Sequence, residues 1–233
     1  MIEIEKLTAD VVKVTYRSKH ETIVNPDNVA NFKPRNGFSI EDTLIVPMNQ
    51  IVELYLALSF VEKDYRLTRP SKSILLKDIN SRVKRIQVFI SKNKPNTLQM
   101  RYINYSDDKA GIIFLEINSL KFRLFVEHLE RVIDKFDILR CVLGDLGFIY
   151  YRKERTLYIT DKYFNMQDSI RIDAHNICRI KSLHNTPLTQ DFCWEIYVGQ
   201  DKNISISNNR FIVNGKQYHQ SIFYELGLLL YRY

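Results

Sequence analysis

Alternation of apolar and polar residues gives way three times to a helical period of three to four residues, and each helical stretch follows strand-like segments. The first helix is expected to begin at Pro47, because the fixed φ of proline suits the first helical position. The second has Asn118 or Ser119 as its expected N-cap and apolar residues at spacings of three and four from Phe122 onward. A third is expected to close the chain at residues 218–229.

Short segments rich in β-branched and aromatic residues precede these helices and predict strands. Before the second helix they are residues 85–90, 97–103 and 112–117, with turn-forming residues between them. After it, the segments that predict further strands are residues 148–151, 156–160, 169–181, 192–198 and 204–213. A meander of antiparallel strands that leads into one helix is the simplest interpretation of each pass.

The fold class expected from this order is α+β, with antiparallel strand meanders each followed by an amphipathic helix. We expect a first strand–helix unit at residues 1–66, a basic linker at 67–81, a second strand–helix unit at 82–140, and a third, strand-rich unit with a C-terminal helix at 141–233. The passes share a pattern of elements and suggest repeated units, but their sequence identity is too low to establish a duplication.

Composition narrows the classes of function. Of the 233 residues, 45% are hydrophobic and 26% are charged, as in an ordinary globular protein. The seven glycines lack the spacing of a dinucleotide-binding or P-loop motif, so no nucleotide cofactor is expected. Three well-separated cysteines favour a reducing, intracellular compartment, namely the cytoplasm, a nucleoid, a nucleus or a viral factory. Neither a signal peptide nor a membrane partner is expected.

Positive charge is concentrated in one segment. The net charge of the whole chain is +7, but residues 66–105 contain ten lysines and arginines and a single acid, Asp78. Such a cluster releases condensed counterions from a polyanion, so it predicts a nucleic-acid site, with a solvated linker as the alternative. The basic residues expected to contact nucleic acid are Arg66, Arg69, Lys72, Lys77, Arg82, Lys84, Arg85, Lys92, Lys94 and Arg101.

The strands of this segment also carry large rings, at Phe89, Tyr102, Tyr105 and Phe114. Alternation sends Arg101 and Tyr105 to one face of a sheet and Tyr102 to the other. One face must pack under the second helix, which leaves the other open for stacking with bases. We expect Tyr102 and Tyr105 to contact bases, with cross-strand packing of the rings as the alternative.

A second, weaker cluster of rings and cations follows the second helix. Its expected nucleic-acid contacts are Tyr151, Arg152 and Lys153. Trp194 lies in a strand-like segment farther on, where a single tryptophan is more often part of the core.

The passage from Arg101 to Phe136 is a strand, a turn, a strand that ends in Leu115-Glu116-Ile117-Asn118, and an amphipathic helix. It resembles the strand-meander-plus-helix unit of the positive-cofactor-four and Whirly superfamily, and residues 37–50 look like a second, poorer copy. Members of that superfamily bind single-stranded DNA or RNA on basic and aromatic sheet surfaces, usually as oligomers. The resemblance covers about half of the chain and implies nucleic-acid contacts at Lys92, Lys94, Arg101 and Tyr102.

The sequence therefore predicts a non-enzymatic protein that binds single-stranded nucleic acid with little sequence specificity, as a homo-oligomer and without a metal or cofactor. The main alternative is an assembly or interaction protein of a virus or mobile element that binds an acidic protein partner. A metal-dependent nuclease is the third interpretation, with Asp173, Asp191 and Glu195 as its carboxylates and Lys202 nearby. A zinc site would use His175, Cys178, His184 and Cys193, whose spacing matches no common finger.

Overall fold

The computed structural model describes residues 2–18, 21–23, 40–62, 73–80, 82–90, 97–106, 109–184, 193–197, 203–207 and 210–232. The chain divides into two compact units, Met1–Phe136 and Asp137–Tyr233, hereafter unit 1 and unit 2. The boundary expected at residues 67–81 therefore lies inside unit 1. In the described part of the chain, no helix combines the length and the hydrophobicity needed to cross a membrane.

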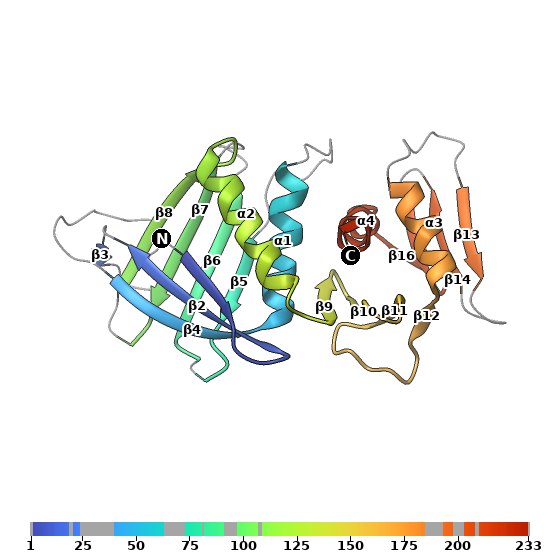
Figure 1. Cartoon of the computed structure of the whole chain (residues 1–233), viewed down its shortest axis with the longest axis horizontal. Helices are drawn as coiled ribbons and strands as arrows, with labels where there is room; N and C mark the ends of the chain where they lie inside the picture. The colour runs from blue at the N-terminus through green and yellow to red at the C-terminus, as the bar shows by residue number, and fades with distance from the viewer. Residues whose placement is uncertain are drawn as a thin grey trace. The chain divides into compact units, whose positions relative to one another are not determined.

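In the described part of the chain, the order of elements is four strands and then a helix, four times over (Figure 1). Unit 1 contains β1 (Ile2–Lys6), β2 (Val11–Ser18), β3 (Glu21–Ile23), β4 (Ile40–Pro47), α1 (Met48–Glu62), β5 (Ser73–Lys77), β6 (Lys84–Ile90), β7 (Thr97–Asn104), β8 (Lys109–Glu116) and α2 (Leu120–Ile133). Unit 2 contains β9 (Ile138–Leu143), β10 (Leu146–Tyr151), β11 (Thr156–Asp161), β12 (Ile170–Ile172), α3 (Ala174–His184), β13 (Cys193–Tyr197), β14 (Asn203–Ser207), β15 (Arg210–Val213), β16 (Lys216–Tyr218) and α4 (Ser221–Arg232). The paired strands are antiparallel, and the expected α+β class is confirmed.

The pass expected at residues 141–233 is two passes, because α3 divides it. We expected a strand at residues 169–181, and that prediction is wrong beyond β12. The Asp173 side chain accepts a hydrogen bond from the backbone N–H of Asn176 at 2.9 Å, as an N-cap does. Ile177 and Ile180, one helical turn apart, are both buried. These two signals end the alternation of β12 and start a helix.

Two sheets pack together in unit 1. β1, β2 and β4 form one sheet, whereas β3 leaves its pass and pairs with β8, so the second sheet has the order β3-β8-β7-β6-β5. α1, α2 and the three-stranded sheet lie on the same side of β5–β8 (Figure 1). The buried rings of Tyr16 on β2 and Tyr102 on β7 stack between the sheets, with centroids 5.2 Å apart. The core of unit 1 therefore lies on this side of β5–β8.

The amphipathic pattern of α2 explains both its start and its packing. Ser119 is the N-cap, and its hydroxyl accepts a hydrogen bond from the backbone N–H of Phe122 at 3.3 Å. The apolar stripe from Phe122 to Ile133 is buried within the chain, against α1, β1 and β8. The stripe is therefore covered without a second copy of the chain, and the expected homo-oligomer stays a prediction.

Part of the expected basic linker is a strand. Residues 73–77 form β5, which pairs with β6 from Ser73 opposite Phe89 to Lys77 opposite Arg85. Leu76 is buried, because alternation turns its side chain toward the core of unit 1. The segment is basic at its ends but apolar in its middle, which is why composition alone did not indicate a strand.

Unit 2 contains two four-stranded sheets, with the orders β12-β11-β10-β9 and β13-β14-β15-β16 and no exchange of a strand between them. α3 packs against α4 and β11, and the side chains on the helix side of β9–β12 are buried. Tyr150 points to this side, where burial raises the pKa of its hydroxyl. α4 is apolar on nearly all sides and buried from Ile222 to Leu230 except at Tyr224, as expected for a central helix.

Candidate nucleic-acid interface

The side of β5–β8 that faces away from α1 and α2 presents its side chains in rows across the strands. We call it the outer face. Strand register gives three rows along it: Phe89–Gln99–Phe114, Gln87–Arg101–Ile112 and Lys77–Arg85–Ile103. The rows contain three cations and two phenylalanine rings, and the next row adds Thr97 and the exposed Glu116. Cations and rings are therefore grouped on one surface, with one acid at its end.

Two arginines of the outer face lie over aromatic rings. The guanidinium carbon of Arg85 is 4.5 Å from the centroid of the Tyr105 ring, and that of Arg101 is 5.0 Å from the centroid of Phe89. Arg101 and Phe89 lie on the neighbouring strands β7 and β6, and Arg85 on β6 reaches Tyr105 in the turn after β7. Burial lowers the pKa of the Arg101 guanidinium from its ordinary value. Because this cation has already lost part of its water, an anion that reaches it would interact strongly.

Other cations around the outer face are not neutralised by acids. Among the described residues, Lys77, Arg82 and Arg85 have no ion-pair partner, and the side chains of Lys77 and Arg82 are exposed. At the other end of the face Phe114 is 62% exposed, a large fraction for a phenylalanine. A ligand that lies across the strands can therefore contact exposed cations at one end of the face and the exposed Phe114 ring at the other.

Lys84 and Tyr102 do not belong to this surface, and the prediction that they are accessible to nucleic acid is wrong. Both point to the core side, where the Lys84 amino group forms an ion pair with Asp42 at 3.1 Å and the Tyr102 hydroxyl donates to the same carboxylate. Tyr102 is only 1% exposed. Burial opposes ionisation of Asp42, but hydrogen bonds from Tyr102 and Thr43 and the charge of Lys84 outweigh it, so the pKa of Asp42 lies below its ordinary value.

The remaining predicted residues divide into two groups. Arg66, Arg69, Lys72, Lys92 and Lys94 lie outside the described residues. Of the second cluster, Tyr151 is half-buried and meets Tyr158 edge to face at 5.7 Å. Arg152 and Lys153 lie in the turn after β10, and Lys153 forms an exposed ion pair with Asp137 at 3.0 Å. The turn is therefore less available to a phosphate than its sequence indicates.

The three-stranded sheet of unit 1 has the opposite electrostatic character. Its exposed side carries Glu3, Glu5 and Glu41, together with Lys13 and Arg17. Arg17 is held by Glu3 at 3.3 Å and by Glu41 at 2.9 Å. A polyanion would be repelled by this sheet and attracted by the outer face, so charge gives unit 1 one preferred side.

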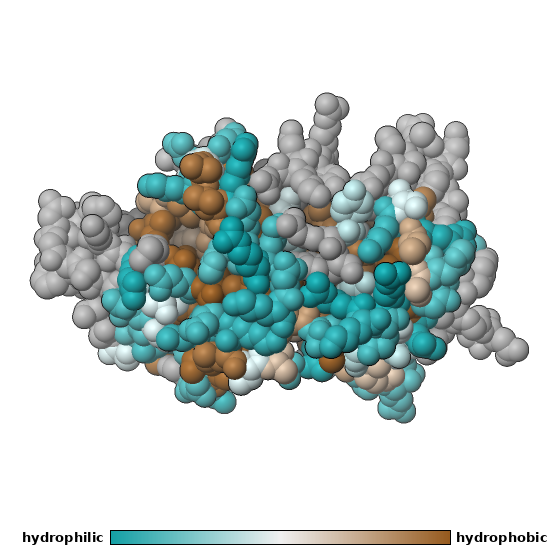
Figure 2. All heavy atoms as spheres, in the orientation of Figure 1, coloured by the Kyte–Doolittle hydropathy of each residue, from teal (hydrophilic) through white to brown (hydrophobic). Residues whose placement is uncertain are grey.

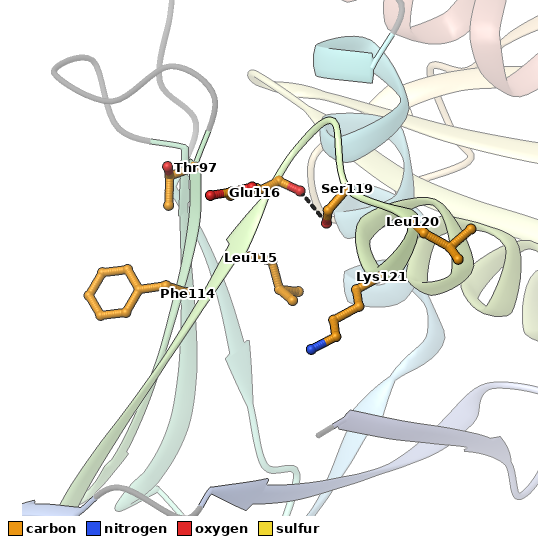
Figure 3. Close-up of a pocket in the computed structure, with 7 residues that line it drawn as sticks. All are labelled: Thr97, Phe114, Leu115, Glu116, Ser119, Leu120 and Lys121. Carbon is orange, nitrogen blue, oxygen red and sulfur yellow. Dashed lines mark hydrogen bonds between the residues drawn. The ribbon is translucent and has the colours of Figure 1, made fainter.

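A groove of about 720 Å³ adjoins the outer face between the end of β8 and the start of α2 (Figure 3). Phe114 points away from α2, whereas Leu115 and the Lys121 side chain point into the space between strand and helix (Figure 3). Hydrophobic residues gather at the N-terminal end of α2 in the space-filling view (Figure 2). Two of the exposed ones on α2 are Leu120, at 70%, and Leu124, at 51%.

Phe89 and Phe114 were not among the predicted contacts, although both rings were visible in the sequence. Pairing of β6 with β7 puts Phe89 on the side of Arg101, and pairing of β7 with β8 puts Phe114 there as well. The available signal was the alternation of each strand combined with its register, and register depends on contacts between segments far apart in the chain.

The carboxylates considered for a nuclease are only partly described. Glu195 is exposed on β13 and Asp173 caps α3, whereas Asp191 and Lys202 lie outside the described residues. Within the described residues there is no group of three or more histidines, cysteines or acids that could hold a metal ion. Comparisons with protein-family models, curated proteins and solved structures found no match to this chain.

Proposed function

We propose that this chain is a non-enzymatic protein that binds single-stranded nucleic acid, with little sequence preference, on the outer face of unit 1. The observation that carries the proposal is the pair of arginine–ring stacks, Arg85 on Tyr105 and Arg101 on Phe89, beside the exposed Phe114 ring. Cations contact any phosphate and rings stack on any base, so such a surface favours little sequence preference.

Single strands are favoured over duplexes because the face of a ring can stack only on a base that is not already stacked on its neighbours. The rows of the outer face cross strands spaced about 4.8 Å apart, so the span from β5 to β8 is about 14 Å. A short stretch of an extended strand can follow such a row, with its phosphates near Arg85 and Arg101 and a base on Phe114.

Binding proceeds in two stages. The unpaired charges of Lys77, Arg82 and Arg85 first attract the phosphates, and release of condensed counterions supplies the affinity. Bases then settle on the rings, where each stacked base contributes about 1 to 3 kcal/mol. The glutamates on the exposed side of the β1-β2-β4 sheet disfavour binding there.

The order of elements supports the same proposal. Each unit contains two successions of four strands and a helix, whereas the sequence suggested one good and one poor copy in the whole chain. On this succession we extend the proposal to the positive-cofactor-four and Whirly superfamily, whose members bind single strands on sheet surfaces. Membership in that superfamily is part of the proposal.

The test replaces both arginines by glutamine, Arg85→Gln with Arg101→Gln, and measures affinity for a labelled oligo-dT strand over a range of salt. On single strands each lost phosphate contact reduces the slope of log K against log salt by about 0.7, so the double variant should lose about 1.4. At about 0.1 M salt this corresponds to about 25-fold weaker binding. A matched control, Lys13→Gln with Lys135→Gln, removes two positive charges elsewhere in unit 1 and should keep the native slope. Equal slopes for native protein and the arginine variant contradict the proposal.

A protein partner is the second candidate, and the exposed Leu120, Leu124 and Phe114 around the groove favour it. In this role the outer face binds an acidic protein, and apolar contacts at the groove add to the charge. Substitution of Leu120 and Leu124 by serine distinguishes the two. It leaves oligo-dT binding unchanged if the ligand is a single strand, because neither leucine lies on the outer face.

A further inference from the structure

The sheet β12-β11-β10-β9 of unit 2 has a second side, opposite the side that packs against α3, on which the half-buried Arg140, Tyr151 and Tyr158 and the exposed Arg171 surround the buried Ile149. Register puts Arg140 opposite Ile149, Ile149 opposite Tyr158, and Tyr158 opposite Arg171, in one row across all four strands. Tyr151 lies on the same side, two residues along β10 from Ile149. We call the surface of Arg140, Tyr151, Tyr158 and Arg171 the Arg140 face.

We propose that the Arg140 face is a second site for single-stranded nucleic acid, so that one chain binds two strand segments. This inference rests on the proposed function of the outer face. It uses other residues than the cluster expected from sequence, since only Tyr151 is common to both.

Charge and rings on the Arg140 face match those of the outer face. Its row has an arginine at each end, about 14 Å apart across four strands, and no acid. Arg171 is exposed and has no ion-pair partner among the described residues. Between the arginines, the half-buried rings of Tyr151 and Tyr158 meet edge to face at 5.7 Å, with planes 76° apart.

Sheet packing explains which side chains reach this side, on which Ile149, Thr156 and Thr160 are themselves buried. Alternation sends Leu139, Cys141, Phe148 and Tyr150 to the helix side, where they are buried. The polar and aromatic residues of the same strands must then point the other way. Such half-buried rings among cations are what a strand of phosphates and unpaired bases requires.

The number of oligo-dT strands bound by one chain tests the inference. The full chain is titrated at about 0.1 M salt with an oligo-dT of about 10 nucleotides, short enough to occupy one face, at concentrations above the native Kd and below the about 25-fold higher Kd expected of the double variants. Native protein should bind two equivalents. Arg140→Gln with Arg171→Gln should bind one, Arg85→Gln with Arg101→Gln should also bind one, and the fourfold variant should bind none.

Matched variants separate charge from folding. Arg179→Gln with Lys216→Gln removes two positive charges elsewhere in unit 2 and should keep two equivalents. Arg171→Gln alone changes only an exposed side chain. It therefore still tests the second site if the variant that also replaces Arg140 does not fold. We expect it to weaken binding of the second equivalent at least fivefold.

Failure of this inference is distinguishable from failure of the proposed function. One equivalent in the native protein, removed by Arg85→Gln with Arg101→Gln and unaffected by the Arg140 variant, overturns the second site and leaves the first. Binding that none of the variants changes overturns both.

Discussion

Tyr102 is the residue for which sequence and structure give opposite expectations, and its substitution is informative. Tyr102→Phe keeps the ring stacked on Tyr16 at 5.2 Å but removes the hydroxyl that donates to Asp42. A hydrogen bond to a charged group contributes about 1.5 to 3 kcal/mol. Because Asp42 keeps the Thr43 N–H at 2.7 Å and the Lys84 amino group at 3.1 Å, we expect a loss near the lower limit, about 1.5 kcal/mol. Tyr102→Ala also empties the ring site and should cost about 3 to 5 kcal/mol.

The loss should depend on pH in a defined direction. The pKa of Asp42 is lower in the folded chain than its ordinary value, so its stabilising effect is complete above about pH 4 and disappears as the pH falls through the lower, folded value. The difference between native protein and Tyr102→Phe should therefore shrink in acid.

The difference in the free energy of unfolding is measured by urea unfolding, monitored by hydrogen exchange of peptides from unit 1. Unit 2 then does not contribute to the signal. Affinity for oligo-dT provides the second readout, and Tyr102→Phe should bind like the native protein. The reasoning is refuted if folded Tyr102→Phe loses affinity for single strands while its stability is unchanged.

Three further predictions concern single residues. Ser119→Ala removes the cap of α2 and should lower the free energy of unfolding by about 1 kcal/mol, with Ser119→Asp as the conservative control; urea titration measures it. Gly144→Ala should lower the stability of unit 2 by about 2 kcal/mol, because φ is +66° and the new Cβ would lie 2.9 Å from Ile222 Cδ1. Gly215→Ala has a similar φ of +75° but open space around the new Cβ, so it should lower the stability by only about 1 kcal/mol. Equal losses for the two glycines would show that Ile222 moves aside freely. Phe114→Ala should change the stability by less than about 0.5 kcal/mol, since the ring is 62% exposed, yet weaken oligo-dT binding at least fivefold.

Local patterns predicted those elements whose stabilising contacts lie close in sequence. α2 combines a capping serine with a regular apolar stripe, and β6, β7 and β8 alternate clearly between turns. α3 was missed because the isoleucines of β12 run directly into those of the helix, and only Asp173 marks the change. β5 was missed because lysine and arginine dominate its surroundings. Its strand character comes from pairing with β6.

For the candidate interface, alternation assigned residues to two faces but could not tell which face would be covered. The choice depends on β2, far away in sequence, whose Tyr16 covers Tyr102. Lys84 points to the same covered side, where its amino group forms an ion pair with Asp42 on β4. Arg101 and Tyr105 lie on the other side, as alternation from Tyr102 requires, and pairing with Ile103 puts Arg85 there as well. Sequence therefore supplied the alternatives, and packing between distant segments decided between them.

Photocrosslinking of the full chain to an iodouracil-substituted single strand, with mass spectrometry of the crosslinked peptides, tests the central claim most directly. We predict crosslinks at aromatic residues of the outer face, to Phe89, Tyr105 and Phe114, which decrease as salt is raised. Crosslinks confined to the glutamate-bearing side of the β1-β2-β4 sheet or to the helices, or no crosslink at a concentration that saturates binding, would contradict it.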